Sequence, residues 1–227
     1  MIRAVAETGS TNEDVAALAG EGATEGTWLR AGRQTGGKGR QGRSWLSPPG
    51  NLYASTLVRL RQGDPPAPTL ALVAAVALHE IVAIYAPGVQ IKWPNDLLFD
   101  GAKLAGILLE RQDDAVILGF GVNLARHPER LDRPATSLAA LAGIAPEPGP
   151  FLEILARNFP RWRARWRQEG LAPIRAAWLA AAHPAGTPLA TPEGEGLFDG
   201  LDETGALRLR LADGTVRIIR AGDVFLV

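Results

Sequence analysis

A glycine-rich segment at residues 32–53 carries side chains whose types and spacing could bind an anion. Its letters, GRQTGGKGRQGRSWLSPPGNLY, include Lys38, Arg40 and Arg43 and no acidic residue. Glycine lets backbone N–H groups approach an anion closely, and the planar fork of arginine matches carboxylates and phosphates. The segment therefore predicts an anionic ligand, with a solvated basic surface loop as the alternative.

The known phosphate-binding motifs do not fit this segment. No Gly-Lys-Ser/Thr precedes a helix, which excludes a Walker P-loop, and a strand pattern follows it, which excludes a dinucleotide fingerprint. The chain has no cysteine, so a thiolate nucleophile and a disulfide framework are excluded. Its three histidines, His79, His127 and His183, are far apart, so we expect no metal site built by the protein.

A second group of candidate residues lies at positions 92–103. KWPND at 92–96 ends a strand pattern, and its proline predicts a turn that presents Asn95 and Asp96 at the tip. Lys103 follows an Asp-Gly pair that predicts a hairpin turn at 100–101. Taken alone, the two KWPND residues fit an ordinary turn and Lys103 fits a solvated hairpin lysine, so these interpretations stay open.

Strand and helix patterns alternate along the first four fifths of the chain. Helices are predicted from a capping box at Ser10–Glu13 or Thr11–Asp14 to Gly20, and over 67–87, 135–143 and 150–182, the last broken near residue 170. Strands are predicted over 2–7, 27–32, 51–60, 89–93, 102–110 and 115–124. This order indicates an α+β domain.

Residues 186–227 differ in character from the rest of the chain. Short strand patterns there are punctuated by Gly, Asp-Gly and Thr-Gly, which is typical of a small β-barrel. We therefore predict two domains, 1–184 and 185–227.

Charge and hydropathy bear on partners and location. The 24 basic and 24 acidic residues balance, whereas a nucleic-acid-binding domain usually carries a basic face. The N-terminus lacks the pattern of a signal peptide, and the apolar run at 67–87 is interrupted by His79 and Glu80, which favours a buried helix over a membrane span. We expect a soluble, cytoplasmic protein without DNA or membrane partners.

Taken together, the motifs resemble a known family. GRQTGGKGRQGRSW…GNLY, KWPNDLL, KLAGILLE and GFGVNLA occur in the order and spacing of the biotin protein ligases, from Ser10 to Asn123, and the C-terminal segment looks like that family's SH3-like domain. The resemblance implies a class II synthetase-like mixed sheet with flanking helices, followed by a small SH3-like barrel. It also implies the monofunctional form, because a first strand that begins at residue 2 leaves no room for a DNA-binding domain. The chain departs from the family at Lys38 and Gln41, where arginine is common.

The resemblance implies a two-step reaction. Biotin and ATP, accompanied by Mg²⁺, give biotinyl-5′-AMP and pyrophosphate, and a lysine of a biotin carboxyl-carrier domain of a biotin-dependent carboxylase then takes the biotinyl group. Two anions meet in the first step, so cations must cancel their repulsion and align them. By carry-over from the family, Arg40 and Lys103 are the predicted catalytic residues.

The same resemblance assigns binding residues, although two of the assignments have structural competitors. Ser10 and Thr11 could instead cap a helix, and Trp45 could instead anchor the loop in the core. The predicted biotin site comprises Ser10, Thr11, Asn12, Gln34, Gly37, Lys38, Arg40, Lys103 and Gly106. The predicted ATP site comprises Arg40, Arg43, Trp45, Asn95, Asp96, Lys103 and Asn123.

Two rival functions remain open at this stage. A lipoate-type protein ligase performs similar chemistry but would show a different basic motif and no KWPND. A non-catalytic biotin- or nucleotide-binding module would not need both Arg40 and Lys103. The sequence also leaves the oligomeric state open, including a homodimer that pairs through strands near KWPND or GVNLA.

Overall fold

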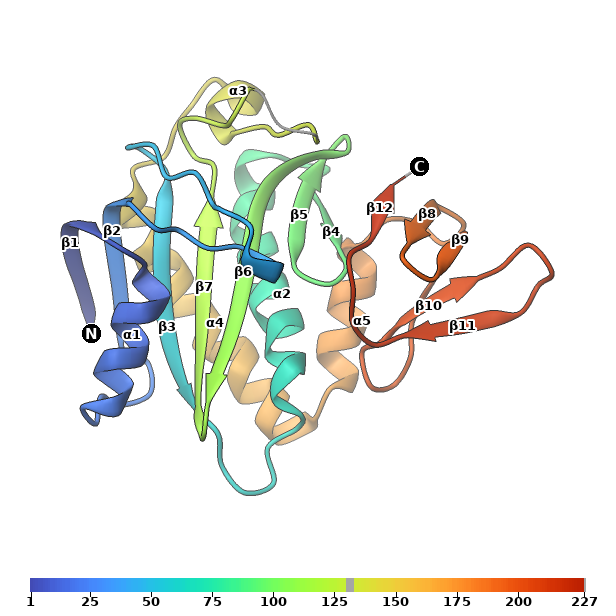
Figure 1. The fold of residues 1–227 in the computed structure, drawn as a ribbon, viewed down its shortest axis with the longest axis horizontal. Helices are drawn as coiled ribbons and strands as arrows, with labels where there is room; N and C mark the ends of the chain where they lie inside the picture. The colour runs from blue at the N-terminus through green and yellow to red at the C-terminus, as the bar shows by residue number, and fades with distance from the viewer. Residues whose placement is uncertain (130–132, 227) are drawn as a thin grey trace.

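A seven-stranded mixed sheet forms the centre of the molecule (Figure 1), as seen in a computed structural model that describes residues 1–129 and 133–226. The strand order is β1-β2-β3-β7-β6-β5-β4, with β1 parallel to β2 and the other pairs antiparallel. The strands are β1 (Ile2–Thr8), β2 (Trp28–Gln34), β3 (Leu52–Arg59), β4 (Gln90–Lys92), β5 (Asp96–Phe99), β6 (Ala102–Gln112) and β7 (Ala115–Val122). The predicted mixed sheet is confirmed.

Helices cover both faces of this sheet (Figure 1). Helix α1 lies on one face, and α2, α4 and α5 lie on the other. The alternation of β3 supplies both cores, because Leu57 packs under α1 whereas Leu52 and Val58 join the larger cluster on the opposite face. The helices are α1 (Thr11–Gly20), α2 (Leu70–Tyr85), α3 (Leu138–Ala142), α4 (Pro148–Glu169) and α5 (Ala172–Ala181), with short 3₁₀ turns η1 (Arg40–Gly42) and η2 (Ala67–Thr69).

The apolar run that approached a membrane span in composition is a core helix. Within the described residues, Ala67–Tyr85 is the one helix long and apolar enough to cross a bilayer, and 67% of its most apolar window is buried inside the fold. Leu70, Val73 and Leu78 are fully buried against the sheet and α4. The predicted buried helix is therefore confirmed.

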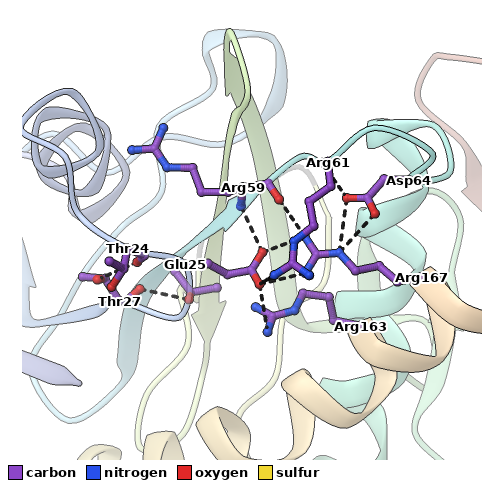
Figure 2. Close-up of polar contacts among 9 residues, drawn as sticks. Thr24, Glu25, Thr27, Arg59, Arg61, Asp64, Arg163 and Arg167 are labelled. Atoms are coloured by element: carbon purple, nitrogen blue, oxygen red, sulfur yellow. Dashed lines mark hydrogen bonds and ion pairs between the residues drawn. The ribbon is translucent and has the colours of Figure 1, made fainter.

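An ionic cluster fastens α4 to the end of the sheet (Figure 2). The carboxylate of Glu25, just before β2, lies 2.7 Å from Arg167 and 3.2 Å from Arg163, both on α4, and it also accepts a hydrogen bond from the backbone N–H of Arg59. Arg167 reaches Asp64 as well, at 3.2 Å. Burial alone would raise the pKa of Glu25, but these partners outweigh it and hold that pKa below its usual value. The cluster joins segments far apart in sequence.

The C-terminal residues form a five-stranded antiparallel sheet with order β11-β10-β9-β8-β12. Its strands are β8 (Pro188–Thr191), β9 (Gly194–Leu201), β10 (Leu207–Arg210), β11 (Val216–Ile219) and β12 (Phe225–Leu226). The indole of Trp93 donates to the carbonyl of Gly205 at 3.1 Å, so this module packs directly on the end of β4. The predicted small β module is confirmed, while the boundary at 184/185 stays a prediction.

One local expectation is wrong, and one possibility that the sequence left open is removed. Ser10 is the N-cap of α1, but its side chain makes no cap hydrogen bond, and the Thr11 hydroxyl lies against Gln34 instead, so neither predicted capping box forms. The strand that contains GVNLA, β7, lies between β3 and β6. It therefore offers no free edge for pairing across a dimer.

Candidate active site

A cavity of about 760 Å³ opens between the basic loop, strands β5–β7 and the C-terminal module. It gathers thirteen of the fourteen residues singled out in the sequence: Ser10, Thr11, Asn12, Gln34, Lys38, Arg40, Arg43, Trp45, Asn95, Asp96, Lys103, Gly106 and Asn123. Gly37 is the exception. A Cβ atom there would lie 2.6 Å from the carbonyl oxygen of Trp45, so this glycine is needed for the loop to close on itself.

The basic loop folds back on itself and so directs its arginines into the cavity. The backbone N–H of Trp45 donates to the carbonyl of Gly37 at 2.8 Å, and that of Gly39 donates to Arg43 at 2.6 Å. Between them, η1 turns through left-handed conformations at Gln41 (φ 57°) and Gly42 (φ 72°). The glycines predicted to shape an anion-binding loop thus also allow its tight turn.

Arg40 and Lys103 meet neighbouring residues of the KWPND motif. The guanidinium of Arg40 is 3.5 Å from Oδ1 of Asn95, at the long limit of a hydrogen bond, and the ammonium of Lys103 is 2.7 Å from Oδ1 of Asp96. Since Asn95 and Asp96 are consecutive, cations from two separated segments converge on one place in the cavity. The sequence could predict both cations but not the residues that hold them.

Asp96 is a buried carboxylate between two ammonium groups. Besides Lys103, it faces Nζ of Lys92 at 3.4 Å. Burial would raise the pKa of Asp96, but the charges of Lys103 and Lys92 outweigh it and hold the pKa below its usual value. Burial lowers the pKa of Lys92, partly offset by the charge of Asp96. Lys92 lines the cavity and stands in the same motif, but no sequence pattern singled it out as a site residue.

The indole of Trp45 lies in the cavity close to two glycines. A Cβ atom at Gly121 would lie 2.5 Å from its ring, so this position needs glycine to admit the indole, and a Cβ atom at Gly106 would make a tight contact of 3.1 Å. The Lys103 ammonium lies 5.4 Å from the ring centroid, within cation–π range. The space above Gly106 is therefore filled by Trp45, which also anchors the loop to strands β6 and β7.

Two predicted ligand contacts already have partners within the protein. Lys38 pairs with Glu13 on α1, and this hydrogen bond raises the pKa of the lysine. The side-chain amide of Asn123 donates to the carbonyl of Thr136 at 3.0 Å, which fixes residues 134–136 at the rim of the cavity. Lys38 is exposed and can exchange its partner, whereas Asn123 is buried.

Four polar residues close the end of the cavity next to α1. Ser10, Thr11 and Asn12 are almost fully buried at the start of that helix, and Gln34 ends β2 beside them. Oε1 of Gln34 accepts from the backbone N–H of Thr11 at 2.9 Å. This end can offer hydrogen bonds to a neutral polar group, while the cations surround the other end.

The C-terminal module contributes a wall that no local pattern predicted. Gly222 accepts a hydrogen bond from Arg40 at 3.1 Å, Asp223 pairs with Arg43 at 3.0 Å, and the carbonyl of Val224 accepts from Lys92 at 2.9 Å. Three consecutive residues thus each meet a different cation of the site.

The cavity offers little for a metal ion held by the protein alone. Within residues 1–129 and 133–226, no group of three or more His, Cys, Asp or Glu side chains is arranged to hold one. The Asp96 carboxylate is engaged by two lysines and that of Asp223 by arginines. Any metal here would need most of its ligands from a bound molecule.

Comparison with family models identifies both parts of the chain. Residues 10–123 match the model described as "Biotin/lipoate A/B protein ligase family". Residues 190–227 match "Biotin protein ligase C terminal domain".

Individual relatives are similar in sequence to this chain over nearly its full length. A biotin–[acetyl-CoA-carboxylase] ligase of Paracoccus denitrificans is 40% identical, covering 97% of this chain and 98% of the relative. A ligase of the same name from Mycobacterium tuberculosis is 37% identical, covering 97% of this chain and 86% of the relative. A solved biotin protein ligase of Aquifex aeolicus, in complex with biotin and ATP, superposes with a TM-score of 0.89 at 26% identity, covering 100% of this chain and 99% of that one.

Proposed function

Because the chain belongs to the biotin/lipoate A/B protein ligase family, we propose that it is a biotin–[acetyl-CoA-carboxylase] ligase. It activates biotin with ATP and transfers the biotinyl group to a lysine of a biotin carboxyl-carrier domain. Relatives that carry this ligase name match at 37–40% identity over 97% of the chain.

One observation of the site supports this chemistry most directly. Arg40 and Lys103 come from segments far apart in sequence and are held by the consecutive residues Asn95 and Asp96. Arg43 and Lys92 line the same cavity. A carboxylate and a polyphosphate repel each other, and a pocket that gathers fixed cations in a restricted cavity is suited to overcoming that repulsion.

In the first step, a carboxylate oxygen of biotin attacks the α-phosphorus of ATP. The bond from that phosphorus to the bridging oxygen breaks, pyrophosphate leaves with the bond's electron pair, and biotinyl-5′-AMP remains. Arg40 and Lys103 bind the biotin carboxylate and the α-phosphate, and Arg43 binds the phosphates. Their fixed charges stabilise the charge that develops during transfer, so the protein needs no nucleophile of its own.

In the second step, the neutral amine of the acceptor lysine attacks the carbonyl carbon of the mixed anhydride. The C–O bond to AMP breaks, an amide forms, the lysine nitrogen gives up a proton, and AMP leaves. Trp45, which lies over Gly106 and Gly121, covers the reacting centre and limits access of water.

The remaining predicted residues divide between the two ends of the cavity. Ser10, Thr11, Asn12 and Gln34 receive the polar ring of biotin, next to the loop of Gly37 and Lys38 and the small residue Gly106. Asn95, Asp96 and Asn123 shape the nucleotide side. ATP would carry Mg²⁺ on its phosphates, where the ion would neutralise part of their charge and need few protein ligands.

A direct assay tests the proposal and its nearest rivals. The purified chain is mixed with ATP, Mg²⁺ and either biotin or lipoate, and pyrophosphate release is measured. Release with biotin alone supports the proposed function, and release with lipoate alone would identify a lipoate ligase. No release with either, combined with biotin binding, would identify a binding module.

Setting and partners follow from the same proposal. We place the ligase in the cytoplasm, as a soluble enzyme in two domains, 1–184 and 185–227, without a DNA target. Its protein partner is the biotin carboxyl-carrier domain of a carboxylase. Neither dimer contact considered from sequence has a free edge, because β7 is interior to the sheet and Ile91 of the last strand, β4, is bridged to Ala182. Sedimentation of the purified chain would measure its oligomeric state.

A further inference from the structure

A buried serine lies directly behind the polar end of the cavity. Ser55, on β3, is fully buried, and its Oγ is 2.7 Å from Oγ1 of Thr11 and 2.6 Å from Oδ1 of Asn12. It does not line the cavity itself. Thr11 does, and so the hydrogen bonds of Ser55 decide what Thr11 can offer to a ligand.

The two amide side chains around this serine have fixed orientations. Nδ2 of Asn12 donates to the carboxylate of Glu110 at 2.6 Å. Because an ionised carboxylate only accepts hydrogen bonds, Asn12 must turn its Oδ1 toward Ser55. A Cβ atom on Gly119 would lie 2.3 Å from this Oδ1, so the amide packs closely on β7. Gln34 likewise turns Oε1 toward Thr11, because it accepts the Thr11 backbone N–H at 2.9 Å.

The available hydrogens are too few for all the close contacts. Three oxygen–oxygen contacts form the chain: Ser55–Asn12 at 2.6 Å, Ser55–Thr11 at 2.7 Å and Thr11–Gln34 at 3.0 Å. Only the two hydroxyls carry hydrogens, and each carries one. One contact must therefore lack a hydrogen, and two bare oxygens repel least at the longest separation. The Thr11–Gln34 contact is the longest of the three, so the hydrogen is missing there, and Oε1 of Gln34 is satisfied by the Thr11 backbone N–H.

We infer that Ser55 is a positioning residue that makes the Thr11 hydroxyl an acceptor toward the ligand. Thr11 donates its hydrogen to Ser55, and Ser55 donates to Asn12, so a Thr11 lone pair is left for the cavity. Such an acceptor recognises an N–H donor. We call the hydrogen bonds from Thr11 through Ser55 to Asn12 the relay. The ureido ring of biotin carries two N–H groups and the dithiolane ring of lipoate carries none, so the relay favours biotin. This inference rests on the proposed function and adds a source of its specificity.

The relay is tested by Ser55→Ala, which leaves Thr11 free to turn its hydrogen to Gln34 or into the cavity. We expect biotin to bind about five- to tenfold more weakly, the size of one oriented hydrogen bond, with the KM for ATP and kcat at saturating biotin unchanged. A biotin analogue methylated at both ureido nitrogens has lost its donors. It should bind the unmodified protein and Ser55→Ala equally.

Two further variants separate the relay from a general packing effect. Thr56→Val removes a hydroxyl of similar burial on the same strand, one that donates to Thr27, and should leave biotin affinity unchanged. Glu110→Ala changes an exposed residue and frees the Asn12 amide to turn over. It should weaken biotin binding without affecting ATP, even if Ser55→Ala fails to fold.

The outcomes distinguish this inference from the proposed function. If the unmodified protein binds biotin but Glu110→Ala and a folded Ser55→Ala bind it equally well, the relay is overturned. If Ser55→Ala weakens the binding of biotin and of the methylated analogue by the same factor, the relay is also overturned. If the unmodified protein neither binds biotin nor releases pyrophosphate with it, the proposed function itself is wrong.

Discussion

The ammonium of Lys103 lies 2.7 Å from Oδ1 of Asp96, across the hairpin of β5 and β6. The carboxylate has lost almost all contact with solvent, so its charge is compensated within the protein. Asp96 therefore has two effects: it fixes the position of Lys103, the cation proposed to act in the reaction, and it makes the stability of the fold depend on that cation.

Asp96→Asn should weaken both the fold and the reaction. Lys103 and the buried Lys92 would lose their counter-charge, and breaking a buried pair from one side costs about 3–5 kcal/mol. Urea unfolding measures the loss of free energy, and pyrophosphate release measures activity. Asp114→Asn, which breaks an exposed pair with Arg59, should cost less than about 1 kcal/mol. Equal stability of the two variants would contradict the role given to Asp96.

The stability that Asp96 provides should depend on pH in one direction. Its pKa in the folded protein lies below the ordinary value of an aspartate, so between the folded and the unfolded pKa the unfolded chain binds more protons. The stabilisation by Asp96 is therefore fully present above the pKa that Asp96 has in the unfolded chain. It is lost as the pH falls through the pKa that Asp96 has in the folded protein. Unfolding of the natural chain and Asp96→Asn, compared from pH 6 to the lowest pH at which both fold, should show a shrinking difference. A difference that grows as the pH falls would refute this sign.

Glu25→Gln should destabilise the protein without touching the cavity. Glu25 holds Arg163 and Arg167 against the sheet (Figure 2), and its loss leaves largely buried guanidinium groups without their main partner. We expect a loss of about 3 kcal/mol in the free energy of unfolding, with the KM for biotin and for ATP unchanged at a temperature where the variant is folded. Glu7→Gln, in an exposed pair with Arg33, is the matched control and should change stability by about 1 kcal/mol or less.

Gly222→Ala should impair the reaction more than a similar change elsewhere in the C-terminal module. Gly222 has φ 133°, a conformation that alanine rarely adopts, and its carbonyl accepts from Arg40. Gly214→Ala introduces strain at φ 85° in a turn outside the cavity. Both variants should lose about 1–3 kcal/mol of stability, but only Gly222→Ala should lower the kcat/KM of pyrophosphate release about tenfold or more. Equal kinetics would show that this module does not position Arg40.

The sequence predicted those parts of the fold whose determinants are local. The period of two in β3 placed Leu57 and Leu52 on opposite faces, and Asp100-Gly101 gave the expected turn with φ of 47° and 77°. The capping boxes failed because the Thr11 hydroxyl is held by Ser55 from β3, a tertiary contact that competes with the local one. Helix-capping preferences are local, so they cannot predict a tertiary contact of this kind.

The candidate site was predictable where its residues are charged or are glycines. It was less predictable where only the fold brings a residue to the site. Arg40 and Lys103 were assigned through the family resemblance, and both line the cavity. Ser55 resembles any buried strand serine in sequence, and only the fold brings it between Thr11 and Asn12. Asp223 lies 180 residues beyond Arg43, and the periodicity of a sequence cannot predict an ion pair between residues so far apart.

The most direct measurement is a double-mutant cycle of Arg40→Ala and Lys103→Ala, read as kcat/KM for biotin-dependent pyrophosphate release. Each single change should cost tenfold or more, about 1.4 kcal/mol of transition-state stabilisation. Because both cations act on the same pair of anions, the double variant should lose less than the product of the two effects. Turnover of Arg40→Ala or Lys103→Ala at the rate of the natural chain would contradict the claim that these residues join biotin to the nucleotide.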